Sequence, residues 1–92
     1  MHFVFYGKDK ADSLDLRLSN RPAHVEWLKS SPIPVAGPIL DGNGNPSGSM
    51  VICEAQDQAA AEALFASDPY AIAGLFASTE IRPWKWVIGA PA

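Results

Sequence analysis

Two side chains in this sequence have the chemical types that proton-transfer reactions use, His24 and Asp68. An imidazole accepts and releases a proton near neutral pH, and a carboxylate on its second nitrogen fixes the tautomer and stabilises the imidazolium that forms. Each residue also has a simpler interpretation: a histidine on a helix face is usually a packed side chain, and an aspartate directly before Pro69 is explained as a helix N-cap. Because the two residues lie far apart in the chain, their spacing alone does not pair them.

Other residue types in the chain support less chemistry. Trp84 and Trp86 could stack on a ring-shaped ligand, but packing in a core or a dimer interface is the commoner role of aromatics on an apolar strand. Cys53 is the only cysteine and lies in a predicted interior strand, so we expect neither a disulfide nor a thiol nucleophile. The two histidines and the carboxylates lack a recognisable metal-ligand spacing, and no glycine-rich phosphate loop opens a helix. We therefore expect no metal and no cofactor.

The composition indicates a small globular protein. Its 92 residues predict a single domain over residues 1–92, with 48% hydrophobic and only 18% charged residues. The formal net charge is −3 and the seven lysines and arginines are scattered, which argues against a nucleic-acid ligand. The longest apolar run, residues 71–77, is too short to cross a membrane, and no signal segment opens the chain. We expect a cytoplasmic protein.

The elements that must position these residues begin with a strand and a helix. Residues 2–6 (HFVFY) predict the first strand. One face of a helix over residues 12–30 is indicated by side chains that recur at three- and four-residue steps, namely Leu14, Leu18, Arg21, Val25 and Leu28. Pro22 interrupts this pattern, so either the helix kinks or a new helix starts there with Asn20 as its N-cap. Both alternatives place His24 near a helix irregularity.

Two strands joined by a loop follow. Residues 35–40 (VAGPIL) and 49–55 (SMVICEA) predict the strands, and the segment between them, DGNGNPSG, consists of turn-forming residues. Pro38 has no N–H to donate to a neighbouring strand. We therefore expect the first of these two strands to lie at a sheet edge or to carry a bulge.

Two more helices and a strand complete the chain. Asp57 is a typical N-cap for a helix over residues 58–66, and Asp68 followed by proline predicts a short helix over residues 69–74. Residues 80–88 (EIRPWKWVI) alternate as a final strand. One face of that strand would carry Arg82, Trp84, Trp86 and Ile88.

The resulting order of elements is strand, helix, strand, strand, helix, short helix, strand. This is the ferredoxin-like βαββαβ pattern of an α+β fold, with an antiparallel sheet and helices on one face. The other face has no helix to cover it, although the last strand carries apolar side chains on both sides. The sequence therefore predicts a homodimer in which a second copy packs on the open sheet face.

Five short motifs occur in an order that resembles a known family: RPAHVEWL (21–28), AGP (36–38), GS (48–49), DPYAIAGL (68–75) and RPW (82–84). Together they resemble the YciI-like (YCII-related) family of small bacterial proteins, over nearly the whole chain. The most specific part is the histidine motif followed later by Asp-Pro-Tyr. The resemblance implies a ferredoxin-like fold of the dimeric α/β-barrel type, related to muconolactone isomerase.

The resemblance also implies an active site. A histidine and an aspartate are proposed to form it in the family, and the matching positions here are His24 and Asp68. One branch of the family is associated with dehydrochlorination of chlorinated hydroxyquinols, which suits an isomerase or lyase step on a small aromatic or carbonyl substrate. The side chains expected to bind the substrate or to stabilise a developing oxyanion are Arg21, Ser49, Tyr70 and Trp84.

Three interpretations of the function remain open at the level of sequence. The chain is a small cofactor-independent enzyme, or a non-catalytic dimeric module that binds a small ligand or a partner, or a protein in which His24 is only structural. Oxygenase activity, as in related dimeric barrels, ranks below proton transfer. The variant His24→Ala separates the first two, because an enzyme loses turnover and keeps ligand affinity, whereas a binder loses affinity.

Overall fold

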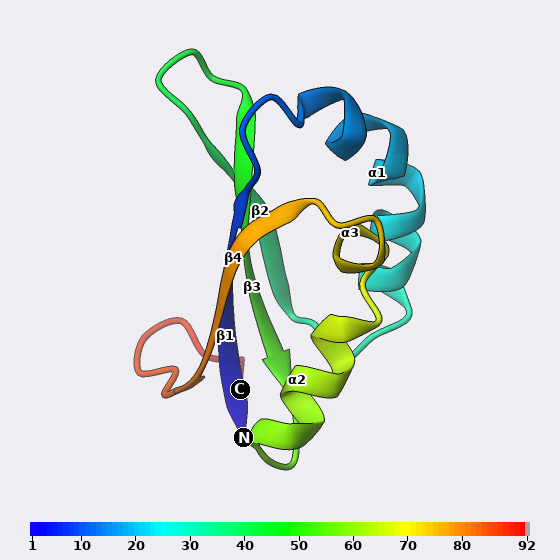
Figure 1. Ribbon diagram of the computed structural model, residues 1–92. Coiled ribbons are helices and arrows are strands. Elements are labelled where there is room, and N and C mark those ends of the chain that lie inside the picture. The colour runs from blue at the N-terminus through cyan, green and yellow to red at the C-terminus, as the bar shows by residue number, and fades with distance from the viewer. Residues whose placement is uncertain (92) are drawn as a thin grey trace.

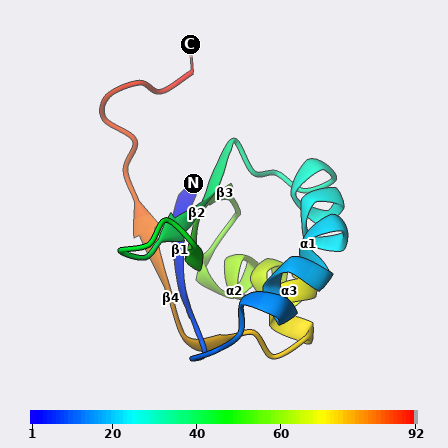
Figure 2. The ribbon, with the colours of Figure 1, turned by 90° about the horizontal axis from the view of Figure 1, so that it is seen from above.

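A four-stranded antiparallel sheet with all its helices on one face forms the protein (Figures 1 and 2). The computed structural model describes residues 1–91. In chain order the elements are β1 (His2–Asp9), α1 (Leu14–Lys29), β2 (Val35–Leu40), β3 (Pro46–Glu54), α2 (Gln58–Ala66), α3 (Pro69–Ile72) and β4 (Phe76–Trp84). The strands lie in the order β2-β3-β1-β4. This confirms the predicted ferredoxin-like α+β fold, and it places β2, which contains Pro38, at a sheet edge.

The helix-covered face of the sheet carries the core. Phe3 pairs with Cys53, and Phe5 pairs with Val51, between β1 and β3. Since alternate residues of a strand point to opposite faces, these four side chains share one face. They are buried together with Phe65 of α2, whose ring stacks on that of Phe5 with centroids 4.6 Å apart. Helix α2 therefore closes the core directly.

Helix α1 packs on α3, and Trp27 and Leu28 near its C-terminal end also pack against the core cluster (Figure 2). Its two buried side chains, Arg17 and His24, are polar. The helix face predicted from the three- and four-residue spacing does not enter the core as a whole: most of it borders a cavity, with Leu18 exposed and Val25 half-buried. Part of α1 therefore faces the strands across a cavity, and the rest packs on α3 and the core.

Pro22 lies inside α1, which is continuous from Leu14 to Lys29. The alternative in which a second helix begins at this proline is therefore wrong. A proline inside a helix leaves the carbonyl four residues earlier, here that of Leu18, without its N–H donor. Both residues are exposed, so water can hydrogen-bond that carbonyl in place of the missing donor.

The last strand lies earlier in the chain than the predicted residues 80–88. Strand β4 pairs with β1 from Phe76, opposite Asp9, to Trp84, opposite His2. Beyond Trp84 the chain has no further β1 residue to pair with, so the last strand ends there. Trp86 accordingly follows the strand and does not belong to its alternating face.

The sheet face away from the helices carries no helix within residues 1–91 (Figure 1), and its centre is apolar, while Glu80 and Arg82 form an exposed ion pair on β4. It includes Tyr6, Met50 and Trp84, whose side chains are 48%, 39% and 39% exposed. None of the helices in the described part of the chain is long and apolar enough to cross a membrane.

Gly48 is a position of the sheet at which a side chain would collide with the backbone. A Cβ at Gly48 would lie 2.6 Å from the carbonyl oxygen of Gly7 on β1, whereas a Cβ at Gly37 on β2 would meet no atom within 4 Å. We expect Gly48→Ala to lower the free energy of unfolding by about 1 to 3 kcal/mol. Gly37→Ala, the matched control, should leave it unchanged or slightly higher. Denaturant titration measures both variants, and equal stabilities would contradict this close approach of the two strands.

Candidate active site

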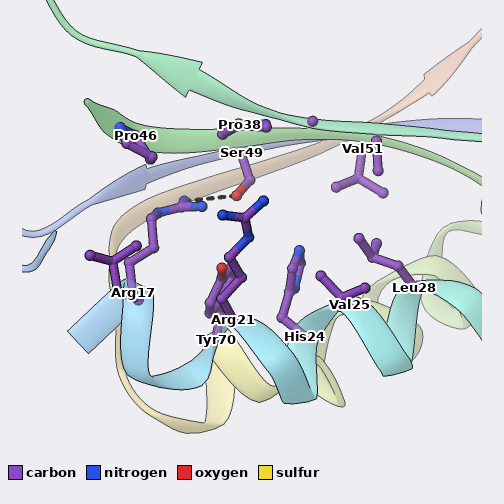
Figure 3. A pocket seen from close by; sticks show the side chains of 13 residues that line it. Arg17, Arg21, His24, Val25, Leu28, Pro38, Pro46, Ser49, Val51 and Tyr70 are labelled. Atoms are coloured by element: carbon purple, nitrogen blue, oxygen red, sulfur yellow. Dashed lines mark hydrogen bonds between the residues drawn. The ribbon is translucent and has the colours of Figure 1, made fainter. Parts of the chain in front are cut away.

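A cavity of about 210 Å³ lies between α1 and the β2–β3 side of the sheet (Figure 3). Side chains of α1 point toward the sheet, and Ser49 and Val51 of β3 point back toward the helix. Apolar groups line much of it. The polar residues of its lining are Arg17, Arg21, His24, Ser49 and Tyr70.

His24 and Asp68 are in direct contact. The distance between Nδ1 of His24 and Oδ1 of Asp68 is 2.8 Å, and both side chains are buried. An ionised carboxylate only accepts hydrogen bonds, so Nδ1 carries the proton and donates it. Nε2 then holds the lone pair of the neutral ring. No buried side-chain nitrogen or oxygen within residues 1–91 lacks a partner, so Nε2, which has no protein partner, is accessible from the cavity.

The same oxygen of Asp68 also caps α3. Oδ1 accepts the backbone N–H of Tyr70 at 2.9 Å, and Pro69 occupies the first turn of the helix. The capping role, which explains this aspartate from sequence, and the contact with His24 are therefore compatible. Helix α3 ends at Ile72, earlier than predicted, and Gly74 beyond it adopts a left-handed φ of 74°.

Aromatic rings hold the imidazole in place. The ring of Tyr70 stacks on that of His24 with centroids 3.9 Å apart and an interplanar angle of 15°, and the Trp27 ring lies at 5.9 Å. Burial raises the pKa of Tyr70, and the positive charge of Arg17 offsets part of that rise. The Tyr70 phenol is therefore neutral at pH 7 and keeps its hydrogen for donation.

Arg17 is a buried residue of the cavity that the sequence analysis did not single out. Its Nε and Nη2 donate to the two carboxylate oxygens of Asp9 at 2.6 and 2.9 Å, and Nη2 also donates to Oγ of Ser49 at 2.8 Å. The guanidinium lies 4.7 Å from the centre of the Tyr70 ring. Burial opposes its charge, but the hydrogen bonds and negative charge of Asp9 outweigh burial and raise the pKa of Arg17. The sequence signal that could have identified Arg17 is its position two helical turns before His24, which places both side chains on the same face of the helix.

Arg21 extends from α1 toward Ser49 (Figure 3). Unlike Arg17, whose charge Asp9 neutralises, Arg21 has no carboxylate within ion-pair distance in residues 1–91. Its charge is therefore available to a ligand in the cavity. In the described part of the chain, no three His, Cys, Asp or Glu side chains gather as a metal-ligand group.

Trp84 is the one predicted site residue that the structure places elsewhere. It pairs with His2 on the sheet face opposite the helices, because Phe3 and its partner Pro83 occupy the helix-covered face. Its ring lies 5.5 Å from that of Trp86, in a shallow groove that Met1 and His2 also line. Trp84 therefore does not line the cavity that holds His24, and its role in substrate binding stays a prediction.

Comparisons with known proteins agree with the resemblance seen in the sequence. The YCII-related domain model matches residues 1–85. The proteins named YciI from Escherichia coli O6:H1 (strain CFT073) and Shigella flexneri are each 37% identical, over 95% of this chain and 99% of theirs. The structure of 5-chloro-2-hydroxyhydroquinone dehydrochlorinase (TftG) from Burkholderia phenoliruptrix AC1100, in complex with 2,5-dihydroxybenzoquinone, is 35% identical with a TM-score of 0.84. The superposed region covers 92% of this chain and 94% of the TftG chain.

Asp68→Ala tests the contact with His24. It removes the oxygen that accepts from both Nδ1 of His24 and the Tyr70 N–H, so no carboxylate holds the imidazole proton on Nδ1. We expect the neutral imidazole to lose its fixed Nδ1–H tautomer and to populate the Nε2–H form as well. The ¹⁵N NMR shifts of the two ring nitrogens, recorded where both histidines are neutral, report the tautomer.

Asp57→Ala is the matched control for this experiment, because it also removes a carboxylate that caps a helix. Asp57 caps α2 through the N–H of Ala60 and has no contact with a histidine. This variant should keep His24 in the Nδ1–H form. A wild-type His24 that is already in the Nε2–H form would contradict the hydrogen bond to Asp68.

Proposed function

Because the chain belongs to the YCII-related domain family, we propose that it is a small cofactor-independent enzyme in which His24 removes a proton from a small aromatic or carbonyl substrate. The observation that supports this most is the buried hydrogen bond between His24 and Asp68 at the wall of a cavity. It leaves Nε2 as a proton acceptor that faces the space where a substrate would bind.

The proton transfer uses each charged group of the cavity in a separate role. Nε2 of His24 takes a proton from a ring hydroxyl or from a carbon beside a carbonyl, and the Asp68 carboxylate stabilises the resulting imidazolium. The electron pair left on the substrate delocalises onto an oxygen. Arg21, whose charge no protein carboxylate neutralises within residues 1–91, stabilises that oxygen. A well-placed base contributes about 10²- to 10⁴-fold to the rate.

A lyase step that eliminates HCl is the reaction we favour, since the 35% identical TftG is a dehydrochlorinase. A proton first moves from a ring hydroxyl to the carbon that bears chlorine, which gives a keto tautomer with chlorine on a tetrahedral carbon. The base then takes a second hydroxyl proton, the electron pair left on that oxygen forms a new carbonyl π bond, the ring double bond shifts toward the carbon that bears chlorine, and chloride leaves with the electrons of the carbon–chlorine bond. No external electron donor or acceptor is needed. The cavity volume of about 210 Å³ is below the range of about 300 to 1,000 Å³ for drug-sized ligands, and it suits a single ring.

His24→Ala tests the proposed role of the base. We use 5-chloro-2-hydroxyhydroquinone as the substrate and measure chloride release, and we measure binding of 2,5-dihydroxybenzoquinone separately. The wild type should release chloride, and the variant should lower kcat by about 10²-fold or more while keeping the Kd within about tenfold. His2→Ala, which removes the histidine on the other sheet face, should keep wild-type values.

Two outcomes of this experiment contradict the proposal. If the wild type releases no chloride and His24→Ala loses affinity for the quinone, the chain is a ligand-binding module. If His24→Ala changes only thermal stability, the histidine is structural.

We also infer that two copies associate through the open sheet face. This face exposes Tyr6 and Met50 next to Val4 and Ile52 on the two central strands, and β4 adds the exposed ion pair of Arg82 and Glu80 at its edge. An apolar sheet face that no helix covers is favourably buried against another such face. A homodimer through this surface is the simplest way to remove it from water, because both copies present the same surface.

Met50→Glu tests this association, since it places a charge at the centre of the proposed interface. We expect the wild type to sediment as a dimer in analytical ultracentrifugation at micromolar concentration, and Met50→Glu to shift it to a monomer. Ile72→Glu is the matched control, because Ile72 is 75% exposed on α3, on the other side of the sheet, and this variant should remain dimeric. A monomeric wild type would contradict the interface.

A further inference from the structure

We propose that Asp9 and Arg17 form a positioning pair that makes the Ser49 hydroxyl a hydrogen-bond donor to an anionic oxygen of the ligand. The inference rests on the proposed function, because it concerns the same cavity. It also specifies the ligand as a single-ring compound that carries a negative oxygen, such as a phenolate or an enolate.

The hydrogen of Ser49 is left free by the contacts around it. A serine hydroxyl has one hydrogen to donate and two lone pairs to accept with. Nη2 of Arg17 donates to Oγ at 2.8 Å, and Ser49 cannot donate in return because a guanidinium has no acceptor. Within residues 1–91 no protein group accepts this hydrogen, and Ser49, only 2% exposed, lines the cavity. Its hydrogen is therefore available to a ligand oxygen.

Arg17 is held so that it keeps Ser49 in this state. Both oxygens of Asp9 accept from its guanidinium, and the guanidinium carbon lies over the ring of Tyr70. The Arg17 and Asp9 side chains are only 4% and 6% exposed. A buried ion pair adds little net stability, because removing two charges from water offsets their attraction. Stability alone therefore does not explain why the helix buries an arginine at this position.

His24 on α1 and Ser49 on β3 thus face one cavity from opposite walls (Figure 3). Asp68 orients His24 as a proton acceptor, and Asp9 orients Arg17, which prepares Ser49 as a hydrogen-bond donor. When Nε2 removes a proton, negative charge moves to a conjugated oxygen of the substrate. A fixed donor at that oxygen stabilises the charge as it develops.

Binding of 2,5-dihydroxybenzoquinone tests the role of Ser49, with 2,5-dimethoxybenzoquinone as the ligand that lacks ionisable oxygens. The visible absorbance of the dihydroxy compound shows that it is bound as the anion. Calorimetry gives the Kd of both compounds. We expect the wild type to bind the dihydroxy compound at least about tenfold more tightly, and Ser49→Ala to weaken that binding by at least about tenfold. Ser47→Ala is the matched control, because Ser47 bonds to the Ile39 carbonyl and does not line this cavity.

A double-mutant cycle tests whether Arg17 acts through Ser49. Arg17→Lys keeps the charge but loses the forked geometry that reaches both Asp9 and Ser49. In the wild-type background it should weaken binding of the dihydroxyquinone about tenfold, and in the Ser49→Ala background less than about twofold. Fully additive effects would overturn the positioning role. If circular dichroism shows that Arg17→Lys is unfolded, Asp9→Asn, which keeps the side-chain shape, replaces it in the same cycle.

The outcomes separate this inference from the proposed enzyme activity, since binding does not require turnover. Binding that depends on Ser49, without chloride release, keeps the inference and overturns the enzyme. Turnover with unchanged kcat and Kd in Ser49→Ala overturns the inference alone. The dihydroxyquinone is a single-ring compound with an anionic oxygen. If the wild type does not bind it saturably, the proposed ligand class is wrong.

Discussion

One carboxylate oxygen, Oδ1 of Asp68, connects the parts of this structure that matter for function. It accepts the N–H that starts α3 and the Nδ1–H of His24 on α1. A helix of four residues has little stability of its own, so α3 depends on its cap and on the packing around it. Removing the oxygen would leave two buried donors without partners, at a cost of about 1 to 3 kcal/mol each. Helix capping, helix packing and the orientation of the imidazole thus depend on the same atom.

The cavity is a consequence of this arrangement. Helix α1 packs on α3, so part of its inner face borders open space instead of strand side chains. The buried positions of α1 are occupied by Arg17 and His24, each with a carboxylate partner from another element. Polar side chains are tolerated inside a protein only when such partners are present. The ring of Tyr70 contacts both of them, which makes the polar groups one packed unit.

The opposite face of the sheet has a different character. Its two central strands present apolar side chains, and the ion pair on its β4 edge, Arg82 with Glu80, is exposed. The two tryptophans near the end of β4 lie on this side with His2. The separation follows from the twofold periodicity of strands, which directs Phe3 to the helices and His2 away from them. Chemistry and proposed self-association are thereby assigned to different faces of one sheet.

Most of the fold and part of the site could be predicted from the sequence alone. Residue spacing, prolines and capping aspartates determined the element order, the edge position of β2 and the helix over residues 58–66. The motifs around His24 and Asp68 indicated the family. These features are local, since each depends on residues a few positions apart. Only the tertiary structure decided that His24 meets Asp68, that Arg17 joins Asp9 to Ser49, and that Trp84 lies on the far face. Those contacts depend on the strand register and on the packing of α1 against α3 and the sheet. A charged side chain is buried only where the fold brings it a partner from elsewhere in the chain.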